Sequence, residues 1–141
     1  MIVDNIYNNK FIVYSFVLLY SVLFLNFGLS TYMLNAPPIM IMDECETCGG
    51  YSIGPFIVVD KSIRPEYYYT VARHEYQHYM QQAVLTPAIL FISYSAEFVL
   101  FGKSYGENIY EIDTFSKQDD GLVFKVFDLE TLKIKTMSKE E

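Results

Sequence analysis

The residues of this chain with the clearest chemical potential are its two histidines, which lie four positions apart. His74 and His78 enclose Glu75 in the pattern H-E-x-x-H. Positions i and i+4 lie on the same face of a helix, so both imidazoles can bind one ion, and zinc is the usual occupant. Glu75 lies beside them and can take a proton from a water that the metal activates and pass it to a leaving amine. The pattern therefore predicts zinc-dependent hydrolysis of peptide bonds, with Glu75 as the general base and acid.

The alternative interpretation is an amphipathic helix with two histidines at the edge of the core and a solvated glutamate. Two histidines placed at random in 141 residues, the first of them followed by a glutamate, give this pattern in roughly one chain in a thousand. That rarity favours a metal site.

A zinc site of this kind needs a third protein ligand, and the chain has no third histidine. A carboxylate must take that place. Glu97 stands in an apolar segment nineteen residues after His78, where a carboxylate needs a metal or a cation such as Arg73 as its partner. Residue type and position leave four candidates, which are Glu97, Glu107, Glu111 and Asp113.

The stretch HEYQHYMQQ, followed about thirty residues later by NIYEIDTF, resembles a group of small bacterial and phage zincin-like proteins with an HEYxHxxQ helix and an N-P-Y-E-x-E-A element. The resemblance covers residues 54–115. It implies a gluzincin-type metallopeptidase in which Glu111 is the third zinc ligand beside His74 and His78, and Gln81 matches the glutamine of the first element. It also implies that residues 54–60 form a strand to which an extended peptide substrate adds.

Within the second element, Asn108, Tyr110 and Glu111 match the family pattern. Three positions differ: proline, the second acid and alanine of the family are replaced here by Ile109, Asp113 and Thr114. Tyr105 and Tyr110 lie near this element, and a tyrosine hydroxyl can donate to the oxyanion of a tetrahedral intermediate. Because the chain has thirteen tyrosines, we favour ring packing with a solvated hydroxyl as the role of both.

The segment that precedes these elements is apolar. Residues 11–34 contain no charged side chain, and twenty-four helical residues at about 1.5 Å each can cross a hydrocarbon core of roughly 30 Å. We predict a single-pass membrane anchor over residues 1–36 that contacts lipid through residues 11–34, with a cleaved signal peptide as the alternative. Lys10 precedes this segment and acidic residues follow it, which favours an extracytoplasmic zinc domain.

Residues 37–141 are expected to form one α+β domain of minimal zincin type. Apolar runs at residues 39–42 and 56–59 predict a hairpin or two short strands. Pro65 marks the start of the helix that carries H-E-x-x-H, and Thr86-Pro87 ends it near Leu85. Residues 88–101 predict a buried helix that covers the active helix, with interfacial membrane contact as the alternative. A helix over residues 108–117 carries Glu111, and alternation at 122–127 and 132–136 predicts a terminal hairpin.

Composition limits the other functions open to the chain. With 10 basic and 17 acidic residues the net charge is −7, and the basic residues form no stripe, which argues against a nucleic-acid partner. Cys45 and Cys48 form a lone C-x-x-C, too little for a disulfide scaffold. We favour a surface turn, closed by a local disulfide in an oxidising compartment, over a redox centre, because Gly49-Gly50 does not open a helix.

These patterns together predict a membrane-anchored zinc metallopeptidase that acts on a peptide or protein substrate. The alternative from another class is a non-catalytic, zinc-stabilised membrane protein that serves as an accessory or interaction module. An open fourth coordination position favours the enzyme, and a fourth protein ligand favours the structural role.

Overall fold

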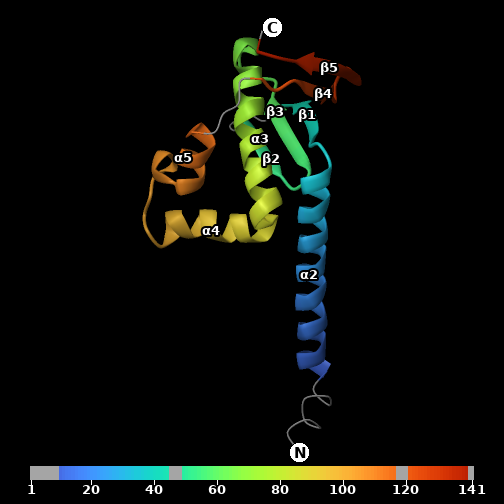
Figure 1. Cartoon of the computed structure of the whole chain (residues 1–141), viewed down its shortest axis with the longest axis vertical. Helices are drawn as coiled ribbons and strands as arrows, with labels where there is room; N and C mark the ends of the chain where they lie inside the picture. The colour runs from blue at the N-terminus through green and yellow to red at the C-terminus, as the bar shows by residue number, and fades with distance from the viewer. Residues whose placement is uncertain (1–9, 45–48, 117–120, 140–141) are drawn as a thin grey trace, which may run out of the picture.

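The computed structural model describes residues 10–44, 49–116 and 121–139, and these residues form an α+β fold, as predicted (Figure 1). The described part of the chain begins with a long helix and continues into a five-stranded sheet with three further α-helices. In chain order the elements are α2 (Lys10–Asn35), β1 (Ile39–Asp43), β2 (Gly50–Ile53), β3 (Phe56–Asp60), a short 3-10 helix (Pro65–Tyr67), α3 (Tyr68–Leu85), α4 (Pro87–Val99), a second 3-10 helix (Tyr105–Glu107), α5 (Ile109–Ser116), β4 (Phe124–Asp128) and β5 (Lys133–Met137).

The five strands form one sheet in the order β2-β3-β1-β4-β5. The three central strands are parallel to one another, and the edge strands β2 and β5 are antiparallel to their neighbours. The predicted terminal hairpin is confirmed as β4 and β5. The predicted strands at 39–42 and 56–59 are also present, as the parallel pair β1 and β3. The hairpin of this region instead joins β2 to β3 through a turn at Gly54, where φ is +54°.

Helix α3 packs against the sheet and divides its side chains between the core and the candidate site. Ala72 and Ala83 are fully buried in the core cluster, together with residues of β1, β3 and β4. By helical periodicity, His74 and His78 lie on the other side of the same helix. The H-E-x-x-H pattern is therefore carried on a helix, as predicted, and that helix is fixed by the core behind it.

The C-terminal third of α2 belongs to the packed fold as well. Met33 and Ser30 are buried, and the Ser30 hydroxyl donates a hydrogen bond to the Ala83 carbonyl of α3. The Tyr79 hydroxyl lies 2.7 Å from the Met33 carbonyl and 2.6 Å from the Ala36 carbonyl, so it caps the end of α2. The rest of α2, from residue 14 to residue 25, is exposed and almost wholly apolar. Among the described helices, Ile12–Asn35 alone is long and apolar enough to cross a membrane by itself.

A sharp corner at Thr86 separates α3 from α4 and confirms the predicted helix end. Thr86 has a φ of +69°, and the axes of the two helical segments differ in direction by 112°. Asn26 of α2 holds this corner: its side-chain amide donates to the Thr86 hydroxyl at 2.6 Å and accepts from the Ala88 N–H at 3.2 Å. The corner is thus fixed at the level of residue 26 along α2.

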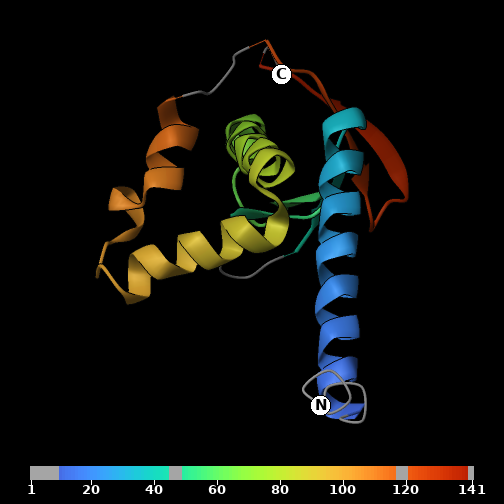
Figure 2. The same cartoon turned by 60° about the horizontal axis from the view of Figure 1, so that its bottom comes forward.

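The prediction that residues 88–101 form a buried helix over the active helix is wrong. Helix α4 forms, but among its side chains only Leu90 is buried. The reason is the corner at Thr86, which turns α4 away from α3 so that the two helices meet mainly near the corner (Figure 2). The inner side of α4 faces α5, to which it presents polar side chains.

The cap between α2 and α3 can be tested with Tyr79→Phe. The change leaves two carbonyls at the end of α2 without their donor, so we expect unfolding of the full chain in detergent to become easier by about 1–3 kcal/mol. Chemical denaturation followed by circular dichroism measures the loss. Tyr67→Phe, at a half-exposed ring, is the matched control and should leave stability unchanged. Equal stability of both variants would contradict this role of Tyr79.

Candidate metal centre

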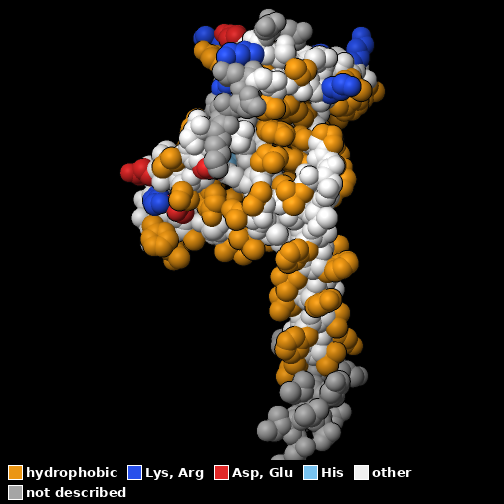
Figure 3. Space-filling model, in the orientation of Figure 1, with side chains coloured by type: hydrophobic (Ala, Val, Ile, Leu, Met, Phe, Trp, Pro, Cys, Tyr) orange, Lys and Arg blue, Asp and Glu red, His pale blue; other side chains and the backbone are white. Residues whose placement is uncertain are grey.

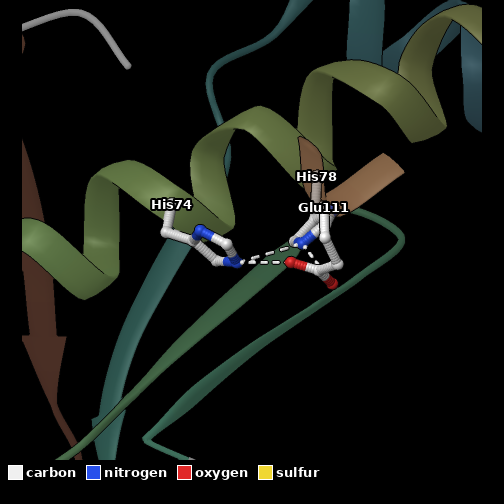
Figure 4. Close-up of side chains that lie close together, drawn as sticks. All are labelled: His74, His78 and Glu111. Atoms are coloured by element: carbon white, nitrogen blue, oxygen red, sulfur yellow. Dashed lines mark hydrogen bonds and ion pairs between the residues drawn. The ribbon is translucent and has the colours of Figure 1, made fainter. Parts of the chain in front are cut away.

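His74, His78 and Glu111 converge on one point between α3 and α5 (Figure 4). The Nε2 atoms of the two histidines lie 3.2 Å apart. Each of them also lies close to a carboxylate oxygen of Glu111, at 3.1 Å from His74 and 3.2 Å from His78. The Glu111 side chain is 2% exposed, and both imidazoles are largely covered. These three residues form a group that could hold a metal ion.

The spacing of these atoms fits a tetrahedral ion. Two ligands that are each about 2.0–2.1 Å from zinc lie roughly 3.3 Å apart in a tetrahedral site. The separation of the two Nε2 atoms, 3.2 Å, and that of His74 Nε2 from Glu111 Oε2, 3.1 Å, are close to that value, while His78 Nε2 lies 3.2 Å from the other carboxylate oxygen, Oε1. In addition, the buried Glu111 Oε2 accepts no hydrogen bond among the described residues, although it lies 3.1 Å from His74 Nε2. A buried acceptor that faces other ligand atoms is what a cation would satisfy.

Gln81, one turn after His78, sets the orientation of that histidine. The Gln81 amide nitrogen donates to the Tyr110 carbonyl at 2.9 Å and to the Asp113 carboxylate at 3.0 Å, so its oxygen faces His78 Nδ1 at 2.9 Å. Nδ1 therefore donates to Gln81, and Nε2 is the ring atom that faces Glu111. The glutamine of the HEYxHxxQ pattern thus fixes the orientation of the His78 ring.

Glu111 lies in the first turn of α5, where its carboxylate contacts His74 and His78 of α3. The Asn108 side chain caps this helix by accepting the Tyr110 N–H at 3.0 Å. The Ile109 N–H donates to the Glu97 carboxylate at 2.8 Å, a bond that the family's proline at this position could not make. Ile109, which differs from the family pattern, therefore makes a contact that anchors the start of α5.

The other three acidic candidates lie outside the metal group. Glu97 forms an ion pair of 2.8 Å with Lys103, whereas we expected a metal or Arg73 as its partner. Glu107 closes a capping box with Ser104, and Asp113 accepts from Gln81 as described above. Within the described part of the chain, Glu111 is the acidic residue that joins the two histidines.

Two tyrosines contact the cluster. The Tyr94 hydroxyl, from α4, donates to Glu111 Oε1 at 2.6 Å. The Tyr105 hydroxyl lies 3.2 Å from His74 Nε2, so the packing role that we favoured for Tyr105 does not describe it. Tyr110 does pack, with its ring on Tyr94 and its hydroxyl donating to Ser93. Sequence reasoning missed Tyr94, although the polar side chains at 93, 94 and 97 recur at helical spacing within an apolar segment.

Burial and charge shift the proton affinities of the site. Burial raises the pKa of the Glu75 carboxyl, against the opposing charges of His78 and His74. Burial favours the neutral form of Glu111 too, but contacts with His74, His78, Tyr94 and Tyr105 outweigh it and hold its pKa well below the usual value. Burial likewise opposes protonation of His78, yet its contacts with Glu111 and Gln81 raise the pKa of this imidazole. Glu111 is thus held as an anion, and the pKa of Glu75 lies above its usual value.

A cavity of about 630 Å³ opens beside the cluster. Its floor contains Glu75, His78 and Glu111, and its two walls are the edge strand β2 and helix α4. Gly50 lets β2 approach α3 here, because a Cβ at this position would lie 2.5 Å from Val71 Cγ1 and 3.2 Å from Glu75 Cγ. The strand beside the cavity is β2. The expected substrate strand at residues 54–60 contains β3, which is flanked by β2 and β1 and offers no open edge.

The C-x-x-C pair, Cys45 and Cys48, lies outside the described residues. The glycines that follow it do not open a helix, as predicted: Gly49 has a φ of +61° and Gly50 begins β2.

Comparison with protein-family models, with curated proteins and with solved structures finds no match to this chain. The chain's own residues and their geometry therefore carry what can be inferred about its function.

The choice of third ligand can be tested by metal titration of the purified full chain in detergent. Glu111→Ala should weaken zinc binding by more than about 100-fold, because it removes a ligand from a three-residue site. Glu97→Ala should cost less, since Glu97 only anchors the helix that carries Glu111. Glu66→Ala, at an exposed carboxylate, is the control. If Glu97→Ala weakened binding more than Glu111→Ala, the assignment of Glu111 would be wrong.

Proposed function

We propose that this chain is a membrane-anchored zinc metallopeptidase. The observation that carries the proposal is the close approach of His74, His78 and Glu111, with separations of 3.1–3.2 Å, beside an open cavity that Glu75, His78 and Glu111 line. A bare H-E-x-x-H pattern lacks a third ligand, and Glu111 supplies one from a separate helix. The group, its spacing and the adjacent acid together support hydrolysis.

The chain's own residues would divide the chemistry as follows. His74, His78 and Glu111 would hold the zinc, which supplies Lewis acidity toward a substrate carbonyl and a water. Glu75 accepts the proton of the attacking water and delivers it to the leaving amine, a role that suits a carboxyl whose pKa is raised by burial. The pKa of the Tyr105 hydroxyl is also raised by burial, so this group stays protonated and can donate to the developing oxyanion.

The substrate is proposed to bind as an extended strand along β2. This strand has a strand neighbour on one side, β3, and forms a wall of the cavity on the other. Its distal end is held by Gln82 of α3, which donates to the Ser52 carbonyl at 3.0 Å and accepts the Gly54 N–H at 2.8 Å. A peptide that pairs with the part of β2 near Gly50 would pass over Glu75, which is the geometry of β-augmentation.

The alternative, a non-catalytic protein that zinc stabilises, predicts a fourth protein ligand. Among the described residues, the group of potential ligands contains His74, His78 and Glu111 and no fourth histidine, cysteine or acid. The cavity beside this group favours the enzyme because it gives a substrate access.

The catalytic role of Glu75 is tested by Glu75→Gln. The amide keeps the shape of the side chain but loses the base, so zinc content should stay at one ion per chain while hydrolysis of a generic peptide falls by at least about 100-fold. His78→Ala is the matched variant that should lose both zinc and activity. Hydrolysis by Glu75→Gln at the wild-type rate would contradict the mechanism.

The proposed anchor and its orientation are tested in intact cells. The full chain should stay in the membrane fraction after high-salt and carbonate washes, because salt does not screen hydrophobic insertion. With the metal centre on the extracytoplasmic side, protease added to intact cells, or to spheroplasts where an outer membrane is present, should digest residues 37–141. Protection until lysis would reverse the orientation. A soluble product about thirty residues shorter would replace the anchor with a signal peptide.

A further inference from the structure

Helix α4 is inverted relative to an ordinary surface helix. Its polar side chains face the protein: Tyr94 donates to α5 and Glu97 accepts the first N–H of α5. Its apolar side chains face outward, with Phe91, Ile92 and Val99 exposed by 73%, 67% and 79%. Leu100 and Phe101 extend this exposed apolar surface beyond the helix. A contiguous apolar surface of this kind indicates an apolar partner.

The exposed part of α2 projects from the same side of the molecule. The bonds from Asn26 to Thr86 and Ala88 hold the start of α4 at the level of residue 26. From Lys10 to Leu25, α2 continues away from the domain for about 24 Å, most of the thickness of a hydrocarbon core. Figure 3 shows hydrophobic side chains along this part of α2 and along the underside of α4, whereas the charged side chains gather higher up and at the outer end of the domain.

The two apolar elements lie at a large angle to each other. Helix α3 packs alongside the C-terminal part of α2, and α4 leaves α3 with a change of direction of 112° (Figures 1 and 2). Helix α4 therefore runs across the direction of α2. If α2 spans a bilayer, α4 lies flat at the bilayer surface, which is the orientation of an interfacial helix with one apolar face.

We propose that α4 lies in the lipid interface of the membrane that α2 spans, with its outer apolar face in the acyl boundary. Because the lipid around α2 lies directly beneath α4, the bilayer itself is the partner that covers this face. The cavity over the metal centre then opens at the membrane surface, since Pro87, Leu90 and Phe91 of α4 line it.

This placement, which here rests on the proposed peptidase function, specifies a substrate class. The cavity runs between α4 at the lipid surface and the strand β2 on the far wall. A polypeptide that emerges from the bilayer beside α4 can reach β2 and Glu75 while its apolar segment stays in the lipid. The substrates are therefore extended segments that lie next to the membrane in membrane-inserted polypeptides.

The position of α4 is measurable because the chain contains no tryptophan, so a single introduced indole is a unique probe. The full chain is reconstituted in phosphatidylcholine vesicles with or without brominated acyl chains, which quench a nearby indole. Ile92→Trp tests α4, and Phe24→Trp, near the Asn26 contact on the exposed part of α2, is the lipid reference. Ile134→Trp, at an exposed position of β5, is the matched control outside the membrane.

We expect Ile92→Trp to be quenched about as strongly as Phe24→Trp and Ile134→Trp to be unaffected. Quenching of Ile92→Trp as weak as that of Ile134→Trp would overturn the proposal, whether α4 then meets water or another protein. Neither zinc nor hydrolysis is needed for this signal, so the result is independent of the proposed activity. The same quenching in the Glu75→Gln background confirms that independence.

The substrate class is tested with one peptide sequence in two forms, free in solution or joined to an apolar helix in the same vesicles. We expect the wild-type chain to cleave the inserted form at least about tenfold faster at equal total concentration, as confinement to the surface raises the effective concentration. Equal rates would overturn the substrate class. Cleavage of neither form would overturn the peptidase proposal, while the indole quenching still decides the position of α4.

Discussion

The buried carboxylate of Glu111 is the constraint on which the site depends. An anion that is 2% exposed is costly unless it is paired and hydrogen-bonded, and the surrounding elements each contribute a group that stabilises it. Helix α3 presents two imidazoles, α4 presents the Tyr94 hydroxyl, and the 3-10 helix before α5 presents Tyr105. The polar side chains of α4 point inward because Tyr94 binds this carboxylate and Glu97 binds the start of the helix that carries it. The apolar side chains of α4 are consequently on its outer face.

Residues that do not belong to the His74, His78 and Glu111 group also hold it in place. Gln81 fixes the imidazole of His78 through its Nδ1 and ties it to α5 through Tyr110 and Asp113. Glu97 holds the N–H of Ile109 at the start of α5. The orientation of His78 is thus fixed by Gln81 on its own helix, which α5 holds in turn, and such support from neighbouring groups is typical of metal sites in proteins. These contacts explain why a glutamine at position 81 matters for the site. They also explain what Ile109, in place of the proline of the similar proteins, adds: an N–H that binds Glu97.

Sequence reasoning located the local features and missed those that depend on the angle between elements. The helix around His74, its end at Thr86 and the terminal hairpin follow from short-range signals such as periodicity and proline, and all three are present. The parallel pairing of β1 with β3 did not follow, because apolar runs do not encode which strands pair. The prediction that residues 88–101 are buried is wrong for a similar reason. Hydrophobicity indicates an apolar environment and does not say whether protein or lipid provides it. The choice of Glu111 needed family resemblance, since four acids matched by residue type alone.

The separation of the ligands along the chain has a consequence for folding. His78 and Glu111 are 33 residues apart, and the chain between them contains α4 and the start of α5. An ion bound by both would act as a cross-link that closes this loop, and the chain entropy that such a closure removes from the unfolded state amounts to roughly 3–4 kcal/mol. The core cluster includes Tyr79 and Ala83 from the α3 end of this loop, and none of its described residues belongs to α4 or α5. A protein of this design can therefore lose the order of α4 and α5 on metal removal while the sheet and α3 stay folded, so that chelation would act as a local unfolding switch rather than a global one.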